Sequence, residues 1–199
     1  MHQAFEAAFG KPSPYETIDN SDDRVVYSPE ALIDLRPGVA ALVSRKEIPG
    51  GCRKCGGALE VDYLRRSAAG FQRLGQWPDI GGGGAYGRAL PWTLRTDLDE
   101  GQTLVTRRDL REGDCSSIKA ELISLRPDHP VKAAEVLLAT SYVASSALHL
   151  PASGVSGAIK PLVRGKSFVV TLIGDARVRQ VYRREGETYQ TRDFGAAGC

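Results

Sequence analysis

The stretch KSFVVTLIGDARVRQVYRREGETYQTRD, residues 166–193, decides the fold class. Its segments 166–173, 177–184 and 188–193 are rich in β-branched and aromatic residues, and Gly-Asp and Glu-Gly pairs separate them. Such pairs are typical of tight turns between strands. The stretch therefore predicts an antiparallel meander of three strands. Apolar residues occupy both alternating sets of positions in the first segment, so we expect that strand to be central and buried on both faces.

Strands are also expected through much of the chain before this meander. Twenty-two glycines and eleven prolines are spread along the sequence and divide it into short segments, which favours β architecture. Residues 131–150 are open between helix and strand, and we favour extended structure there because the neighbouring segments are strands. Further strands are predicted at residues 24–27, 38–45, 58–66, 92–97, 103–107 and 117–125.

Two short helical pieces are expected near the amino terminus. Residues 2–9 can form a helix with Phe5 and Phe9 on one face, because positions four apart are neighbours on a helix surface. Ser28-Pro29-Glu30 offers a helix cap followed by a proline at the first helical position. This second signal predicts one turn of helix that ends near Leu35.

The segment ALEVDYLRR, residues 58–66, alternates apolar and polar side chains at its centre. Leu59, Val61 and Tyr63 alternate with Glu60, Asp62 and Leu64, a pattern that predicts a half-buried strand leaving the CxxC turn.

A long loop is expected at residues 68–89, where four consecutive glycines occupy positions 81–84. The glycines lack the GxxxxGK[ST] pattern of a phosphate-binding loop, and a strand rather than a helix is predicted to follow them. Phe71, Trp77 and Tyr86 lie in this loop, and aromatic residues dominate the energetics of protein interfaces. We therefore predict these three as partner-binding residues, with core packing as the alternative role.

Together these segments predict a mainly β fold, with α+β as the variant if residues 131–150 are helical. A chain of 199 residues is long enough for one substantial domain. We expect an N-terminal arm at residues 1–23 and a single domain at residues 24–199. That domain is expected to be an antiparallel, sandwich-like β structure with a short N-terminal helix and long glycine-rich loops.

Charge and motif content exclude several classes of function. The 26 basic and 24 acidic residues are well mixed and give a net charge of only +2, so no global field favours nucleic acid. No apolar run approaches the roughly 20 residues of a membrane-spanning helix. The sequence has no GxSxG or HExxH motif and only three histidines, so general bases are few. These absences favour a noncatalytic protein without a cofactor.

Cys52 and Cys55 form a CxxC pair between two glycine pairs, and three roles are open for it. As half of a zinc site, the pair would need two further ligands, and no second closely spaced pair is present. As a redox-active dithiol, it would usually precede a helix, whereas a strand is predicted here. As a structural element, it would form a short disulfide.

An even number of cysteines fits a structural role for all four in an oxidising compartment. The pairing that we favour joins Cys115 to Cys199, with Cys52 and Cys55 either bridged or reduced. The first residues do not have the pattern of an intact secretory signal. We therefore expect either a periplasmic or secreted protein whose signal was removed, or a cytoplasmic one.

Three segments carry a resemblance to a known group of proteins: CRKCGGALEVDYLRR at 52–66, GDCSSIKAELISLRPDHPV at 113–131, and SGAIKPLVRGKSFVVTLIGDARVRQVYRR at 156–184. With the closing cysteine, they resemble a loosely defined group of exported bacterial proteins. Proteins of this size and type often serve as periplasmic immunity or inhibitor proteins that bind a secreted toxin. The resemblance implies binding rather than catalysis, and it transfers no catalytic residues.

The first functional hypothesis is therefore a noncatalytic module that binds another protein, as an immunity protein does a secreted toxin or an inhibitor an enzyme. The alternative is a zinc-knuckle subunit of a larger complex that binds nucleic acid. In the alternative, Cys52 and Cys55 bind zinc while Arg45, Lys46, Arg53 and Lys54 contact phosphates.

Overall fold

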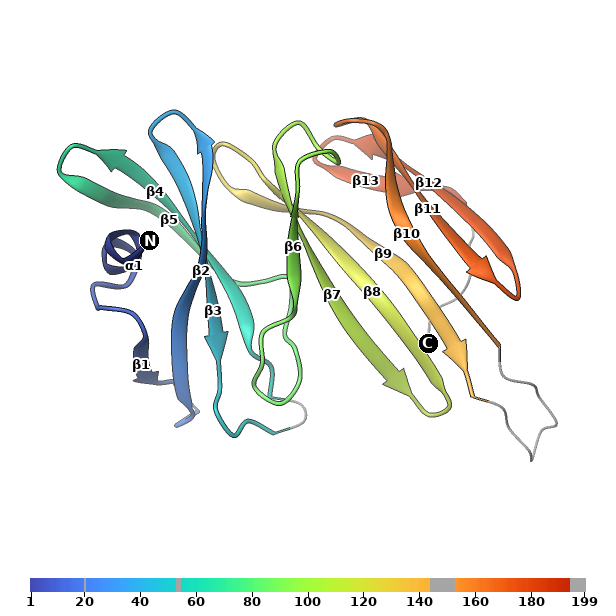
Figure 1. Cartoon of the computed structure of the whole chain (residues 1–199), viewed down its shortest axis with the longest axis horizontal. Coiled ribbons are helices and arrows are strands. Elements are labelled where there is room, and N and C mark those ends of the chain that lie inside the picture. The colour runs from blue at the N-terminus through green and yellow to red at the C-terminus, as the bar shows by residue number, and fades with distance from the viewer. Residues whose placement is uncertain (20, 53–54, 144–152, 194–199) are drawn as a thin grey trace. The chain divides into compact units, whose positions relative to one another are not determined.

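The protein is mainly β, with one short helix, in the computed structural model shown in Figure 1. The structure describes residues 1–19, 21–52, 55–143 and 153–193. Its strands form a five-stranded and an eight-stranded antiparallel sheet, and neighbouring strands in each sheet follow one another along the chain. The predicted fold class, with its short N-terminal helix and antiparallel sheets, is confirmed.

The chain divides into two compact units. The first comprises Met1–Pro91 and Leu125–Pro130, and the second comprises Trp92–Ser124 and Val131–Cys199. The predicted arm at residues 1–23 contains a helix and a strand that both belong to the first unit. The single domain at residues 24–199 that is expected from the sequence stays a prediction.

The five-stranded sheet belongs to the first unit, and its strands β3 and β4 are buried on both faces over most of their length. The inner strands contain long apolar runs because neither of their faces meets solvent. The strands, in sheet order, are β1 (Tyr15–Ile18), β2 (Arg24–Arg36), β3 (Val39–Glu47), β4 (Ala58–Ser67) and β5 (Gly70–Ile80).

The helix α1 (His2–Phe9) covers one face of this sheet. Ala4, Phe5 and Ala8 are buried in a cluster with Leu42 of β3 and Leu64 of β4. These helical residues recur at intervals of one, three and four, which places them on a single face of α1. The helix is therefore held by packing, since eight residues are too few for a stable isolated helix.

Two expectations for the first unit are wrong. Residues 28–35 form no helical turn, because β2 continues through them with a register shift between Pro29 and Ala31. Proline is tolerated at such an irregularity, where a ladder hydrogen bond is already missing. Residues 70–80 are likewise not part of a loop but form β5, which pairs with β4 from Gly70 to Ile80.

The eight-stranded sheet contains the predicted meander. β11 lies between β10 and β12, so the expectation of a central strand is confirmed, although Ile173 near its end is 61% exposed. Residues 131–142 are extended, as favoured, and residues 144–152 lie outside the described part. The strands are β6 (Trp92–Arg95), β7 (Gln102–Glu112), β8 (Cys115–Leu125), β9 (Pro130–Tyr142), β10 (Ser153–Val163), β11 (Ser167–Gly174), β12 (Arg177–Glu185) and β13 (Thr188–Thr191).

The second unit is sandwich-like because its sheet folds over at β9 and β10. These strands pair only between 139–142 and 153–156, and Figure 1 shows them diverging beyond that point. A Cβ at Gly157 would collide with the backbone of Thr171, so glycine allows β10 to bend close to β11. The two halves of the sheet are β6–β9 and β10–β13, and they share one core. The first half contributes Val105, Leu122 and Val136, and the second contributes Phe168, Leu172 and Tyr189.

A buried polar network closes the two halves of the second unit on each other. The Asp99 carboxylate precedes β7, accepts a hydrogen bond from the Ser124 hydroxyl at 2.7 Å, and lies 3.3 Å from the Arg184 guanidinium. The hydroxyl of Tyr189 donates to the Leu98 carbonyl at 3.2 Å. These bonds join β8, β12 and β13 to the loop that contains Leu98 and Asp99. They also provide partners for the Asp99 carboxylate, which would be costly to bury without them.

Candidate functional site

The CxxC segment and the glycine-rich segment lie side by side in the first unit. The backbone N–H of Ile48 donates to the Gly87 carbonyl at 2.8 Å, and the N–H of Gly87 donates to the Cys55 carbonyl at 2.6 Å. We call residues 48–52, 55–57 and 81–91 together the double loop. The sequence predicted two separate features, and the fold brings them together.

Close backbone contacts explain why both segments are rich in glycine. A Cβ built on Gly51 would lie 2.9 Å from the Gly87 Cα, and one on Gly56 would lie 3.0 Å from the Gly83 Cα. Real Cβ atoms do not approach backbone atoms this closely. A Cβ on Gly87 would collide with the Ile48 carbonyl oxygen, and its φ of 72° also favours glycine. The glycines of the double loop therefore serve close packing.

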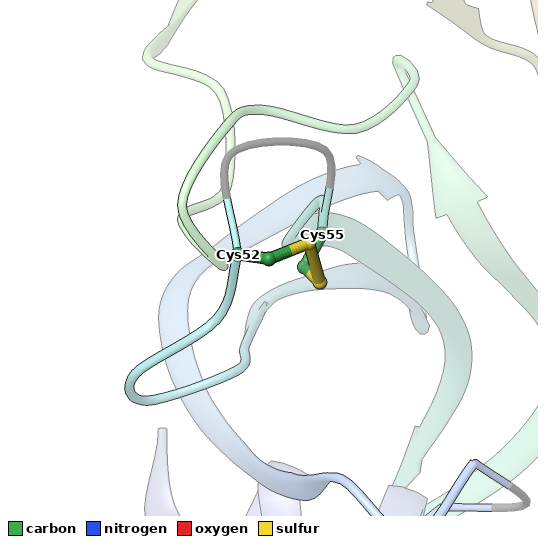
Figure 2. Close-up of a disulfide and its surroundings, with 2 residues drawn as sticks. All are labelled: Cys52 and Cys55. Carbon is green, nitrogen blue, oxygen red and sulfur yellow. A yellow bond between two sulfur atoms is a disulfide. The ribbon is translucent and has the colours of Figure 1, made fainter.

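A disulfide between Cys52 and Cys55 closes the first segment of the double loop, as Figure 2 shows. The Cys55 N–H also donates to the Cys52 carbonyl at 3.0 Å, which makes the CxxC a hydrogen-bonded turn. The structure shows this pair as a disulfide, which is the form expected for the structural role. Zinc binds thiolates, and bonded disulfide sulfurs are not thiolates. In the part of the chain that the structure describes, no group of three His, Cys, Asp or Glu side chains could hold a metal ion.

Tyr86 lies in the second segment of the double loop and is 61% exposed. Its φ of 55° is in the left-handed region, which is uncommon for residues other than glycine. The neighbouring Gly87 is buried and fixed by its two hydrogen bonds. An exposed aromatic side chain is thus presented from a backbone with little freedom to move, so the structure places this predicted partner-binding residue at the surface.

Phe71, the second predicted partner-binding residue, packs on the helix side of β5. It lies partly buried against the cluster that includes α1, and the guanidinium carbon of Arg66 is 5.5 Å from its ring centroid. This geometry is that of a cation–π contact at the edge of a core.

Trp77, the third, lies on the opposite face of the same sheet. Its ring is 4.7 Å from the ring of Tyr63, centroid to centroid. A Cβ at Gly75 would collide with the indole of Trp77, so the glycine makes room for the ring to lie back on the strand. The structure therefore does not bring the three aromatic residues together on one surface.

The basic residues of the nucleic-acid alternative are partly engaged in ion pairs. Arg45 lies 2.9 Å from Glu30 and 3.6 Å from Glu47, and Lys46 lies 3.4 Å from Asp79. The pair with Glu30 joins β3 to the neighbouring β2, Glu47 lies on β3 itself, and Lys46 reaches across β4 to β5. Arg53 and Lys54, the other two, lie outside the described residues.

The predicted disulfide between Cys115 and Cys199 stays a prediction. Cys115 begins β8, is almost fully buried, and its Sγ lies 3.9 Å from the Thr140 hydroxyl of β9. Cys199 lies outside the described residues.

The sequence analysis missed a buried pair of carboxyl groups on β4. A half-buried strand would leave the Glu60 and Asp62 side chains facing water, but they are 2% and 0% exposed. The alternating pattern misled because α1 covers the face that would otherwise meet solvent. Burial raises the pKa of Glu60, and burial together with the charge of Glu60 raises the pKa of Asp62 to about 7. In the sequence, the signal that α1 covers this face of the sheet was the apolar face of the helix at residues 2–9.

No known protein family, no curated protein and no solved structure matches this chain. Among the described residues, no helix is long and apolar enough to cross a membrane.

Proposed function

We propose that this protein is a noncatalytic binding module that engages another protein through the double loop, with Tyr86 as the aromatic anchor. One observation carries the proposal: an exposed tyrosine stands on a backbone that a disulfide and interlocking glycines hold in place. Anchors at protein interfaces are enriched in tyrosine, tryptophan and arginine. A rigid loop loses little conformational entropy when it binds, so more of the contact energy appears as affinity.

The surface around the anchor favours a protein as the partner. Arg45 and Lys46, at the end of β3 that leads into the double loop, are each paired with a carboxylate, so they attract phosphates less than free cations would. The net charge of +2 adds little long-range attraction for nucleic acid. Tyrosine offers both an apolar ring and a hydroxyl, which suits the mixed surfaces of proteins.

We further propose that the partner is a secreted toxin or enzyme, and that the chain acts as a bacterial immunity or inhibitor protein in the periplasm or outside the cell. The Cys52–Cys55 disulfide supports an oxidising compartment, because such bonds persist there and are rare in reducing cytoplasm. The resemblance to exported bacterial proteins supports the same class of partner. Inhibitors of this kind commonly present a preorganised loop, since preorganisation lowers the cost of binding.

Site-specific photo-crosslinking tests this proposal. A photoreactive phenylalanine analogue would replace Tyr86 in one variant and Tyr142, an exposed tyrosine of the other unit, in the control. We expect one protein of the exporting cell to be crosslinked from position 86 and not from position 142. The protein identified in this way would then be purified, and its binding measured directly. Equal crosslinking from both positions, or none from position 86, would contradict the proposal.

A further inference from the structure

Glu60 and Asp62 lie two residues apart on β4, so their side chains emerge on the same face of the sheet. Leu42 and Ser44 of β3 are their cross-strand neighbours, opposite Asp62 and Glu60 respectively. All four side chains on this face are 2% exposed or less. Two carboxyl groups therefore share a dry environment under α1.

Few donors satisfy these carboxyl groups. The Gln76 amide of β5 donates to Glu60 Oε1 at 2.6 Å. Within the described residues, neither carboxylate oxygen of Asp62 accepts a hydrogen bond, and the buried hydroxyl of Ser44 has no partner either. Because the two side chains are neighbours on one face of β4, ionising both would place two like charges side by side in a buried site. A proton retained on one of them removes that repulsion.

The nearby charges do not balance the pair. On β5, Arg73 Nη1 lies 3.9 Å from Asp62 Oδ1, but the Arg73 side chain is 42% exposed to solvent. Lys46 of β3 is paired with Asp79 of β5. Tyr27 of β2 also faces this cluster, and its pKa is raised to about 12 by burial and by the charges of Glu60 and Asp79.

The helix that covers the pair offers no charge of its own. The α1 face toward the sheet consists of Ala4, Phe5 and Ala8, whereas its ionisable residues His2 and Glu6 are exposed. Arg73 links α1 to the pair directly, because the guanidinium that lies near Asp62 also donates to the Ala8 carbonyl.

We propose that Glu60 and Asp62 share one proton in the folded protein, and that loss of this proton loosens the docking of α1. The inference concerns a different face of the first unit and does not depend on the proposed partner. A second negative charge in the dry site would repel the first, and water can reach both carboxylates only if the helix moves away. The ion pair to Arg73 opposes this effect, but its solvent exposure screens it.

The direction of the effect follows from the pKa of Asp62. Burial is the largest cause of its rise to about 7, the charge of Glu60 comes next, and Arg73 acts in the opposite direction. A carboxyl group whose pKa is raised on folding holds its proton more tightly in the folded state. Folding is therefore favoured at low pH, and this advantage is lost as the pH rises from about 4 toward 7.

Hydrogen exchange of the α1 amides across a pH series tests the proposal on the full chain. After correction for intrinsic exchange rates, we expect protection in the wild type to fall by up to about tenfold per pH unit between about pH 4 and pH 7, and to level off above pH 7. The Asp62→Asn variant keeps the shape but removes one of the two titrating groups, so its protection should depend on pH less steeply than that of the wild type. Asp34→Asn is the control, since the Asp34 side chain is 72% exposed on a neighbouring strand of the same sheet and should leave the wild-type behaviour unchanged.

A second measurement keeps the proposal testable if Asp62→Asn does not fold. The infrared spectrum of the wild type should show a protonated carboxylic acid at about pH 6, where ordinary carboxyl groups are ionised. Absence of that band would overturn the proposal. So would α1 protection that depends on pH in the same way in the wild type and in Asp62→Asn.

Discussion

Glycine 87 shows how a single residue holds the double loop together. Its N–H and its carbonyl both bond to the neighbouring segment, its φ is positive, and a side chain would enter the space of the Ile48 carbonyl. Gly113, in the turn between β7 and β8, also has a positive φ of 58°, but a Cβ there would meet nothing within 4 Å. The two glycines thus separate the effect of backbone conformation from that of close packing.

Replacing Gly87 with alanine should therefore cost more than replacing Gly113. We expect Gly113→Ala to lower the free energy of unfolding by about 1 kcal/mol, the usual cost of a positive φ for alanine. Gly87→Ala should lower it by at least about 2 kcal/mol, because backbone atoms must also move apart. Urea denaturation of both variants measures the difference. Equal losses would show that the double loop is less tightly packed than the structure indicates.

Among the elements, β11 places three fully buried side chains, those of Phe168, Val170 and Leu172, in the core of the second unit. Phe168 is fully buried, and its ring centroid lies 4.8 Å from that of Tyr182 and 5.1 Å from that of Tyr189. These rings come from three successive strands of the meander, so they join β11, β12 and β13 through side chains as well as through backbone bonds.

We expect Phe168→Ala to lower the free energy of unfolding by about 3 to 5 kcal/mol, because it leaves a cavity between these rings. Ile173→Ala on the same strand is the matched control and should change stability by less than about 1 kcal/mol, since Ile173 is largely exposed. Denaturant titration of both variants gives the comparison. A small loss for Phe168→Ala would mean that β11 is not central to the core.

Elements that local contacts define could be predicted from the sequence, whereas elements that distant contacts define could not. The meander at 166–193 was predictable because its turns and its strands are local signals. β5 was not, because Gly70, Gly75 and Pro78 have low strand propensity, and pairing with β4 supplies the missing stability. The register of β5 also sends Phe71 and Trp77 to opposite faces. The double loop joins segments about 30 residues apart, and no local pattern encodes that contact.

At the scale of the whole molecule, the second predicted disulfide would restrict the unfolded chain strongly. A bond between Cys115 and Cys199 closes a loop of roughly 80 residues, which corresponds to roughly 4 kcal/mol in the entropic description. We expect peptide mapping under non-reducing conditions to recover the peptides of Cys115 and Cys199 as one species. Alkylation of Cys199 without prior reduction would contradict the pairing.

The balance of charge over the molecule leads to a prediction about nucleic acid. Because acidic and basic residues are interspersed, we expect no binding to DNA or RNA tighter than the nonspecific range of roughly 10⁻⁴ to 10⁻⁶ M at physiological salt. Fluorescence anisotropy with a labelled oligonucleotide over a salt series measures this. Submicromolar affinity with a steep salt dependence, abolished by changing Arg53 and Lys54 together, would instead support the nucleic-acid alternative.

The central claim is that the double loop binds a protein through Tyr86. The affinity of the partner identified by crosslinking, measured for the wild type, Tyr86→Ala and Tyr142→Ala, tests it most directly. We expect Tyr86→Ala to weaken binding by about 2 kcal/mol or more, which is about a 30-fold rise in Kd, with little dependence on salt. Tyr142→Ala should bind as the wild type does. An unchanged Kd for Tyr86→Ala would contradict the account.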